Sequence, residues 1–270
     1  MAGPIVRSER DGDVVVLTLN DPERRNAMTE AMGRALSVEV AQLAGDAAVR
    51  CVVLAGAGGA FSAGGDLGMI EARGTAGRAD PGGPAREANR RAMEAFYRLF
   101  LAIRDVPCPT IAAIGGAAIG AGLCVALACD LRLAASSARL GLNFTRLGIH
   151  PGMGATWTLP RIVGPARAAE LLYTGRIIDG SEAARIGLVG EATEPGRTLE
   201  RALDLARELA RSAPLAVRGT KQALARSQAA TLDDQLGFEA ARQAECYETE
   251  DLVEGIAAAR EKRAPQFRGW

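Results

Sequence analysis

The sequence is poor in the residues from which metal and disulfide sites are built. Its 270 residues include one histidine, and its five cysteines contain no C-x-x-C pair. An odd number of cysteines without such spacing argues against a zinc or disulfide framework and for a reducing compartment. The first residues also lack the long apolar run of a signal peptide. We therefore expect a cytoplasmic protein that holds no metal.

The sequence also has no excess of charge of either sign. Lys and Arg number 32, Asp and Glu also number 32, and the formal net charge is zero. Nucleic acid and anionic membrane surfaces are therefore not expected as partners. One uncharged stretch, residues 106–129, is long enough to span a bilayer, but it begins with prolines and is interrupted by four glycines. We expect a buried strand, a tight turn and a buried helix there instead of a membrane span.

Short apolar runs alternate with helical patterns in the first half of the chain, and helices dominate the last third. Thr29 is a suitable N-cap for a helix that runs to about Leu43. Residues 74–84 are rich in glycine, proline and arginine without periodicity, which indicates a mobile surface segment. This order predicts an α/β core over residues 1–195 and a helical region over residues 196–270. Strands are expected at 14–19, 51–55, 110–114 and 131–134, and further helices at 85–103, 120–128, 165–173, 181–186, 198–211, 215–227, 231–247 and 250–262.

Two glycine-rich segments follow predicted strands. Residues 56–67 come after the predicted strand 51–55, and residues 115–122 come after the predicted strand 110–114. Glycine lets a backbone approach a ligand closely and leaves its N–H groups uncovered. Two such loops can direct two N–H donors at one oxygen, which is the usual construction of an oxyanion hole. The alternative is that both segments are only tight turns.

A dinucleotide site is a second alternative for these loops. Its fingerprint requires G-x-G-x-x-G or a final alanine after a strand. The first loop places Phe61 at the position that must be small, and the second loop offers no such pattern. The sequence therefore disfavours a nicotinamide cofactor.

Residues 61–67 read F-S-A-G-G-D-L, which closely resembles a signature of the enoyl-CoA hydratase/isomerase family, the crotonases. Other family-like motifs lie in the family's order and spacing at residues 22–28, 116–130, 147–152, 174–189 and 254–267. The combination is specific for the family but not for one reaction within it. The resemblance implies an α/β fold with a crotonase-like spiral of ββα turns and a C-terminal helical trimerisation region. It therefore implies a homotrimer or a homohexamer.

The resemblance also implies the chemistry that the family shares, which is stabilisation of an enolate-like anion on an acyl-CoA thioester. Carried over to this sequence, the two oxyanion donors are the backbone N–H groups of Gly65 and Ala121. Ala121 falls at the start of the predicted helix 120–128, where unpaired N–H groups and the helix dipole favour negative charge. Asp66 is expected to cap neighbouring N–H groups instead of acting as a base, and Asp130 is likewise expected to be structural.

Acyl-CoA is the substrate that the resemblance implies, with no further cofactor. Arg24 or Arg25 would contact the CoA phosphates, and Lys262 in the C-terminal tail is a third candidate. The alternative for each of these charges is a solvated surface residue. The remaining CoA-binding positions by resemblance are Ala27, Ala63, Gly64, Asp66 and Leu67.

The sequence departs from the family pattern at the catalytic acids. Family hydratases carry two glutamates, and the corresponding positions here are Cys124 and Phe144. Adding water to a double bond requires a positioned base and acid, each contributing roughly 10²–10⁴-fold. Hydration is therefore in doubt.

Two residues, Cys124 and His150, are candidates to take over the role of these acids. Cys124 is either a thiol activated at a helix start or a small buried hydrophobe. His150, the only histidine, is either an acid or base or a loop residue. Phe144 is expected to be a pocket wall.

The sequence thus predicts an acyl-CoA-binding enzyme of this family, a lyase or an isomerase. Two alternatives stay open. One is another crotonase-type reaction, such as isomerisation, decarboxylation or thioester hydrolysis. The other is a non-catalytic acyl-CoA binder.

Overall fold

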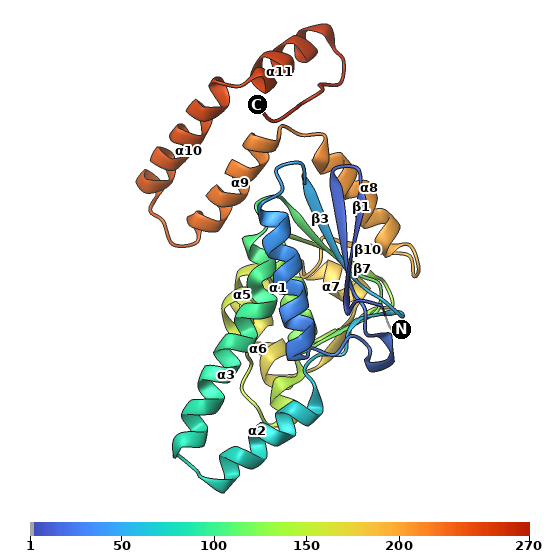
Figure 1. Cartoon of the computed structure of the whole chain (residues 1–270), viewed down its shortest axis with the longest axis vertical. Coiled ribbons are helices and arrows are strands. Elements are labelled where there is room, and N and C mark those ends of the chain that lie inside the picture. The colour runs from blue at the N-terminus through green and yellow to red at the C-terminus, as the bar shows by residue number, and fades with distance from the viewer. Residues whose placement is uncertain (1–2) are drawn as a thin grey trace.

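A computed structural model describes residues 3–270 and places a six-stranded sheet at the centre of the protein (Figure 1). The strand order is β1-β2-β3-β5-β7-β10. The first pair is antiparallel and every other pair is parallel. The strands of this sheet are β1 (Val6–Asp11), β2 (Val14–Leu19), β3 (Cys51–Gly56), β5 (Thr110–Ile114), β7 (Leu131–Ala135) and β10 (Glu191–Thr193).

A second, four-stranded sheet takes one short strand from each turn of the chain. Its order is β4-β6-β8-β9, with bounds β4 (Ala60–Ser62), β6 (Ala117–Ile119), β8 (Arg139–Gly141) and β9 (Ile177–Asp179). Strand pairs β3/β4, β5/β6 and β7/β8 each divide between the two sheets and lead into a helix. This repetition is the spiral of ββα turns that the sequence resemblance implied.

Helices cover both faces of the larger sheet because its central strands are apolar at successive positions. Leu54 of β3 points into a core shared with Leu36 of α1 and Phe100 of α3. The neighbouring residue Val53 points to the other face, where Ala206 of α8 packs. The helices are α1 (Glu30–Ala44), α2 (Leu67–Ala79), α3 (Pro84–Leu101), α4 (Ala121–Ala128), α5 (Ala155–Val163), α6 (Pro165–Thr174), α7 (Gly180–Arg185), α8 (Thr198–Ala210), α9 (Pro214–Ser227), α10 (Leu232–Tyr247) and α11 (Glu250–Glu261).

Several local predictions are confirmed, and one is wrong. Thr29 caps α1, where its hydroxyl accepts a hydrogen bond from the Met32 N–H at 3.2 Å. The segment 74–84 was predicted to be a mobile surface segment, but α2 continues through it to Ala79 and α3 begins at Pro84. Helix α2 forms there despite its glycines because Asp66 caps it and α3 packs against it. The proline occupies the first turn of α3, where it costs no hydrogen bond.

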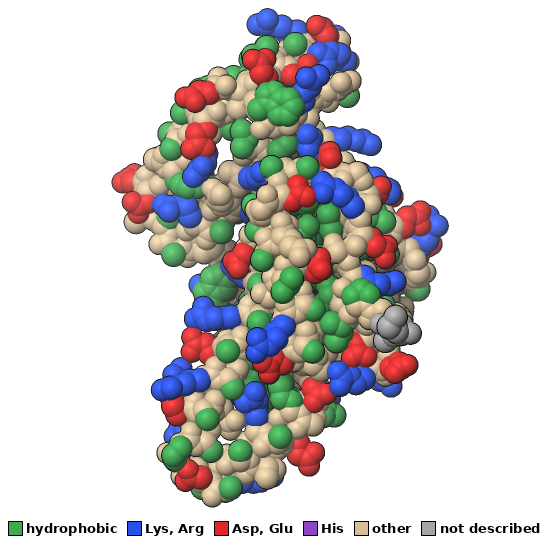
Figure 2. Space-filling model, in the orientation of Figure 1, with side chains coloured by type: hydrophobic (Ala, Val, Ile, Leu, Met, Phe, Trp, Pro, Cys, Tyr) green, Lys and Arg blue, Asp and Glu red, His purple; other side chains and the backbone are tan. Residues whose placement is uncertain are grey.

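The C-terminal region leaves the core after α8. The sequence assigned all residues from 196 onward to a helical region separate from the α/β core. Helix α8 lies within this range, but it packs on the sheet. Helices α10 and α11 extend away from the sheet at the opposite end of the molecule from α2 (Figure 1). Figure 2 shows basic and acidic side chains interspersed over the face in view. Among the described residues, no helix combines the length and the apolarity needed to cross a bilayer.

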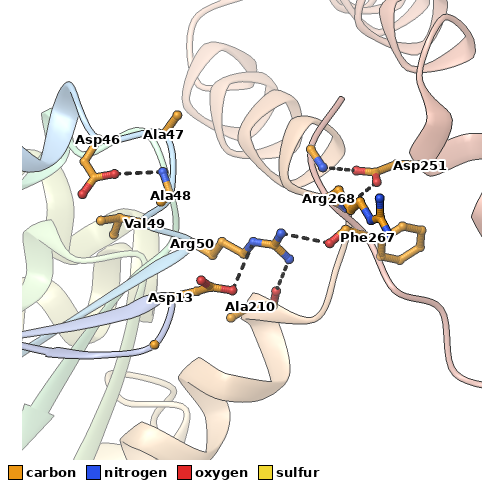
Figure 3. Close-up of polar contacts among 12 residues, drawn as sticks. Asp13, Asp46, Ala47, Ala48, Val49, Arg50, Ala210, Asp251, Phe267 and Arg268 are labelled. Atoms are coloured by element: carbon orange, nitrogen blue, oxygen red, sulfur yellow. Dashed lines mark hydrogen bonds and ion pairs between the residues drawn. The ribbon is translucent and has the colours of Figure 1, made fainter.

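Arg50 ties the end of the chain back to the core (Figure 3). Its guanidinium donates to the Ala210 carbonyl at 3.1 Å and to the Phe267 carbonyl at 2.9 Å, and its Nε lies 3.4 Å from Asp13 Oδ2. The buried carboxylate of Asp251 accepts hydrogen bonds from the backbone N–H groups of Arg268 and Gly269, at 2.6 and 2.8 Å. These contacts hold the tail along α11 and against the β1–β2 end of the sheet.

Candidate active site

A cavity of about 870 Å³ lies between the two glycine loops and helices α2 and α3. The 3-10 helix Asn143–Leu147 and the loop after it close the remaining side. Most of the wall is apolar, with side chains from Met69, Ile70, Met93, Phe96, Ile119, Phe144, Leu147, Ile149 and Met153. The volume falls in the range typical of small-molecule sites.

The two glycine loops meet at positions that admit only glycine. Gly64 has a φ of 98°, and a Cβ there would lie 2.6 Å from the Ile119 carbonyl oxygen and 3.8 Å from the Ala121 nitrogen. A Cβ at Gly122 would lie 2.6 Å from the Cβ of the buried Ser62. Because no side chain separates the loops, the backbone after each strand lines the same cavity.

The N–H of Gly65 faces away from the protein backbone that pairs with its loop. Gly65 forms a parallel bridge with Met28, in which the Met28 N–H donates to Gly64 O at 2.7 Å and the Asp66 N–H donates to Met28 O at 3.4 Å. This pattern uses the groups on either side of Gly65 and turns its own N–H to the opposite side. Gly65 itself lines the cavity.

Ala121 presents the second N–H. It is the first residue of α4 and follows Gly120, which has a φ of 51° and donates its own N–H to Gly141 O at 2.7 Å. The first N–H groups of a helix have no partner within the helix and carry the positive end of its dipole. Within the described residues, neither Gly65 nor Ala121 donates its N–H to another protein group. The loops therefore present two free donors to one cavity.

Both aspartates that the sequence predicted to be structural have structural contacts. Asp66 caps α2 through a hydrogen bond from the Met69 N–H to its Oδ1 at 2.8 Å. Its other oxygen lies 3.9 Å from Arg24 Nη1. Asp130 lies away from the cavity and accepts from the Thr110 N–H at 2.8 Å and from Lys221 Nζ at 2.7 Å. Both carboxylates therefore make the structural contacts that the sequence predicted for them.

The predicted CoA-binding residues divide into two groups. Arg24 lines the cavity, and the carboxylate of Asp21 raises the pKa of its guanidinium. Arg25 does not line the cavity, and neither does Lys262, which ends α11 at the opposite end of the molecule (Figure 1). Within one chain, Lys262 therefore does not contribute to this cavity. The other predicted positions all line the cavity: Ala27, Ala63, Gly64, Asp66 and Leu67.

Comparison with known proteins decides the family. The model of the family described as enoyl-CoA hydratase/isomerase matches residues 9–269. The chain belongs to this family. It is 35% identical to the short-chain-enoyl-CoA hydratase of Clostridium acetobutylicum, over 94% of each protein. It is 36% identical to the 1,2-epoxyphenylacetyl-CoA isomerase of Escherichia coli, over 98% of each. The chain is also similar to the crystal structure of an enoyl-CoA hydratase from Bacillus anthracis, with 36% identity and a TM-score of 0.88. The match covers 98% of this chain and 99% of the hydratase chain.

The cavity of this family member has a wall that is short of acids. Among the described residues, Asp66 is the only carboxylate that lines the cavity. Phe144 is half-buried in the wall, in agreement with the predicted packing role. His150 is exposed at the cavity rim, and its Nδ1 lies 2.7 Å from the Pro151 carbonyl oxygen.

The hypothesis of an activated thiol at Cys124 is wrong. Cys124 is 2% exposed, and burial raises its pKa to about 12. The thiol donates to the Gly152 carbonyl at 3.7 Å and does not line the cavity. Desolvation outweighs the helix start, so Cys124 packs as a small hydrophobe.

Four polar residues of the wall were not identified from the sequence: Arg73, Asn89, Tyr97 and Asn143. Only the helical pattern of residues 85–103 offered a signal, because it placed Tyr97 on one face with Met93 and two phenylalanines. Arg73 borders the segment that was predicted to be irregular. A helix there was needed to direct this residue toward α3.

Proposed function

We propose that this protein binds an acyl-CoA in the 870 Å³ cavity and stabilises negative charge on the thioester oxygen. The observation that carries this proposal is the pair of free N–H groups at Gly65 and Ala121 on one cavity wall. Donors fixed in a site shielded from water stabilise a developing oxyanion more strongly than water does. The acyl chain would lie against the apolar side chains of α3 and of residues 144–153.

The proposed chemistry is an enolate reaction other than hydration through two carboxylates. The Clostridium relative is named as a hydratase and the Escherichia relative as an isomerase, so the family supports either. Asp66, the one carboxylate of the described wall, is held by its capping bond and lies near Arg24. An isomerisation that moves one proton needs less acid–base assistance than the addition of water. His150 at the rim is the proposed proton carrier.

We propose that Arg24 neutralises phosphate charge of CoA at the mouth of the cavity.

We also propose that the active form is a homotrimer or homohexamer. Support for association comes from exposed apolar side chains on the C-terminal helices, where Leu232 is 72% and Val253 is 61% exposed. Surfaces of this kind favour burial against a partner. Light scattering at micromolar concentration tests the assembly, and a clean monomer contradicts it.

Two variants at one position test the oxyanion proposal. Ala121→Pro removes the N–H, and proline is well tolerated at the first position of a helix. Ala121→Gly keeps the N–H and serves as the matched control. Calorimetric titration with hexanoyl-CoA and with free CoA should show that Ala121→Pro weakens binding of the thioester more than binding of CoA. Equal affinities for hexanoyl-CoA in all three proteins would contradict the proposal.

A further inference from the structure

Three polar side chains form a cluster on the otherwise apolar wall that α2 and α3 build. Arg73 of α2 and Asn89 and Tyr97 of α3 all line the cavity and are half-buried. The Asn89 side-chain amide donates to the Arg73 carbonyl at 3.1 Å, and Arg73 Nη1 donates to Asn89 Oδ1 at 3.5 Å. The asparagine therefore holds the two helices together and leaves most of the guanidinium's donors unused.

The guanidinium of Arg73 has no countercharge. Within residues 3–270 it forms no ion pair, and its buried Nε has no hydrogen-bond partner. By contrast, Arg24, the other arginine of the cavity, pairs with Asp21 at 2.9 Å and lies 3.9 Å from Asp66. A partly buried cation without a partner is unfavourable unless a ligand supplies the opposite charge. The planar guanidinium matches a carboxylate with two parallel hydrogen bonds.

The Tyr97 end of the cluster lies near the start of α4, which carries one of the two oxyanion donors. A Cβ at Gly152 would overlap the Tyr97 hydroxyl, so this hydroxyl rests against the Gly152 backbone. The Gly152 carbonyl accepts from Cys124, which is in the first turn of α4 after Ala121. Burial and the neighbouring Cys124 raise the pKa of Tyr97, while Arg73 lowers it. Tyr97 therefore remains a neutral hydrogen-bond donor beside the guanidinium.

We propose that Arg73 and Tyr97 recognise a carboxylate at the far end of the acyl chain. The substrate class is then the CoA thioester of a dicarboxylic acid. This inference rests on the proposed function, because the thioester oxygen must first lie at Gly65 and Ala121. The ligand carboxylate supplies the charge that Arg73 lacks, and it accepts hydrogen bonds from the guanidinium and from the Tyr97 hydroxyl. The apolar side chains between the two ends contact the methylene groups.

Calorimetric titration with matched acyl-CoA pairs tests this inference on the full-length protein. The pairs are valeryl- and glutaryl-CoA, and hexanoyl- and adipoyl-CoA, which differ only in a terminal carboxylate in place of a methyl group. In at least one pair, the dicarboxylic thioester should bind roughly 10- to 100-fold more tightly. Arg73→Met should abolish this preference, Arg73→Lys should retain part of it, and Tyr97→Phe should reduce it. Arg78→Met, on the same helix but outside the cavity, should leave it unchanged.

The outcomes separate this inference from the proposed function. If the unmodified protein binds no acyl-CoA, the proposed function itself fails. If it binds both members of each pair equally, only the carboxylate inference is overturned. If Arg73→Met weakens hexanoyl- and adipoyl-CoA by the same factor, Arg73 holds a CoA phosphate instead and the inference is again overturned. Unchanged hexanoyl-CoA affinity in Arg73→Met shows that the variant is folded.

Discussion

Asn26 is expected to be the most sensitive polar side chain of the site's framework. It is fully buried, and its backbone φ is 55°, in the left-handed region that asparagine tolerates better than alanine. Its Oδ1 accepts from the Asp21 N–H at 2.9 Å, and its Nδ2 donates to the Ala57 and Ala60 carbonyls, each at 2.9 Å. It therefore ties the segment that carries Arg24 to the first glycine loop.

The cost of Asn26→Ala follows from these contacts. Three hydrogen bonds at about 1 kcal/mol each, together with about 1 kcal/mol for alanine at a positive φ, give a loss of roughly 3–4 kcal/mol in the free energy of unfolding. The bonded backbone groups are left without partners in a buried place, which prevents water from restoring much of this energy. Acyl-CoA affinity should fall as well, because Arg24 and Ala27 lose their anchor.

Urea unfolding followed by circular dichroism measures this loss. Asn20→Ala is the matched control, because its Nδ2 makes one exposed hydrogen bond, to the Pro4 carbonyl at 2.9 Å, and it should cost less than about 1 kcal/mol. Asn26→Gly separates the backbone effect, because glycine accepts the positive φ but lacks the amide. A loss below about 1 kcal/mol in Asn26→Ala would refute the reasoning that this network holds the loop.

Three further outcomes are expected. Gly122→Ala should lower the unfolding temperature because its Cβ would lie 2.6 Å from Ser62 Cβ, whereas Gly115→Ala meets nothing within 4 Å and should not. Hydration of a short trans-2-enoyl-CoA should be slow, because each missing acid–base group costs roughly 10²–10⁴-fold in rate. The loss of enoyl absorbance measures this rate, and a turnover near 10 s⁻¹ would show that another base is active. Burial raises the pKa of Cys124 from 9.0 to about 12, so the folded state favours the neutral thiol. The contribution of this neutral thiol to the free energy of unfolding is complete below pH 9 and is lost as the pH rises toward 12. Urea unfolding between pH 8 and 11 should show a shallower decline in Cys124→Ala than in the unmodified protein, and identical slopes would argue against a buried neutral thiol.

The sequence predicted four of the six strands of the larger sheet, β2, β3, β5 and β7, and the positions of the glycine loops, because these depend on local signals. Strands β3 and β5 are apolar at successive positions, and glycines follow each of them. Strands β4, β6 and β8 have three residues each, too few for a periodicity to be recognised. They exist because neighbouring turns of the spiral pair with one another, which is a property of the tertiary structure.

The polar side of the cavity was not predictable for a related reason. Helix α2 contains three glycines and has no buried residue, so its sequence resembles a loop. Its helical form depends on the Asp66 cap and on packing against α3. The Arg73 cluster exists only once these two helices are paired. Likewise, the position of Cys124 at a helix start suggested a low pKa, but burial, which sequence position does not reveal, dominates.

Polarisation of the thioester carbonyl is the most direct test of the central claim, that Gly65 and Ala121 form an oxyanion hole. Hexanoyl-CoA labelled with carbon-13 at its carbonyl allows this one vibration to be followed by difference infrared spectroscopy. On binding, the carbonyl stretch should move to lower frequency, because two N–H donors lengthen the C=O bond. The shift should persist in Ala121→Gly and shrink in Ala121→Pro at saturating ligand. A bound thioester whose carbonyl frequency equals that in water, or a shift that survives in Ala121→Pro, would contradict the account.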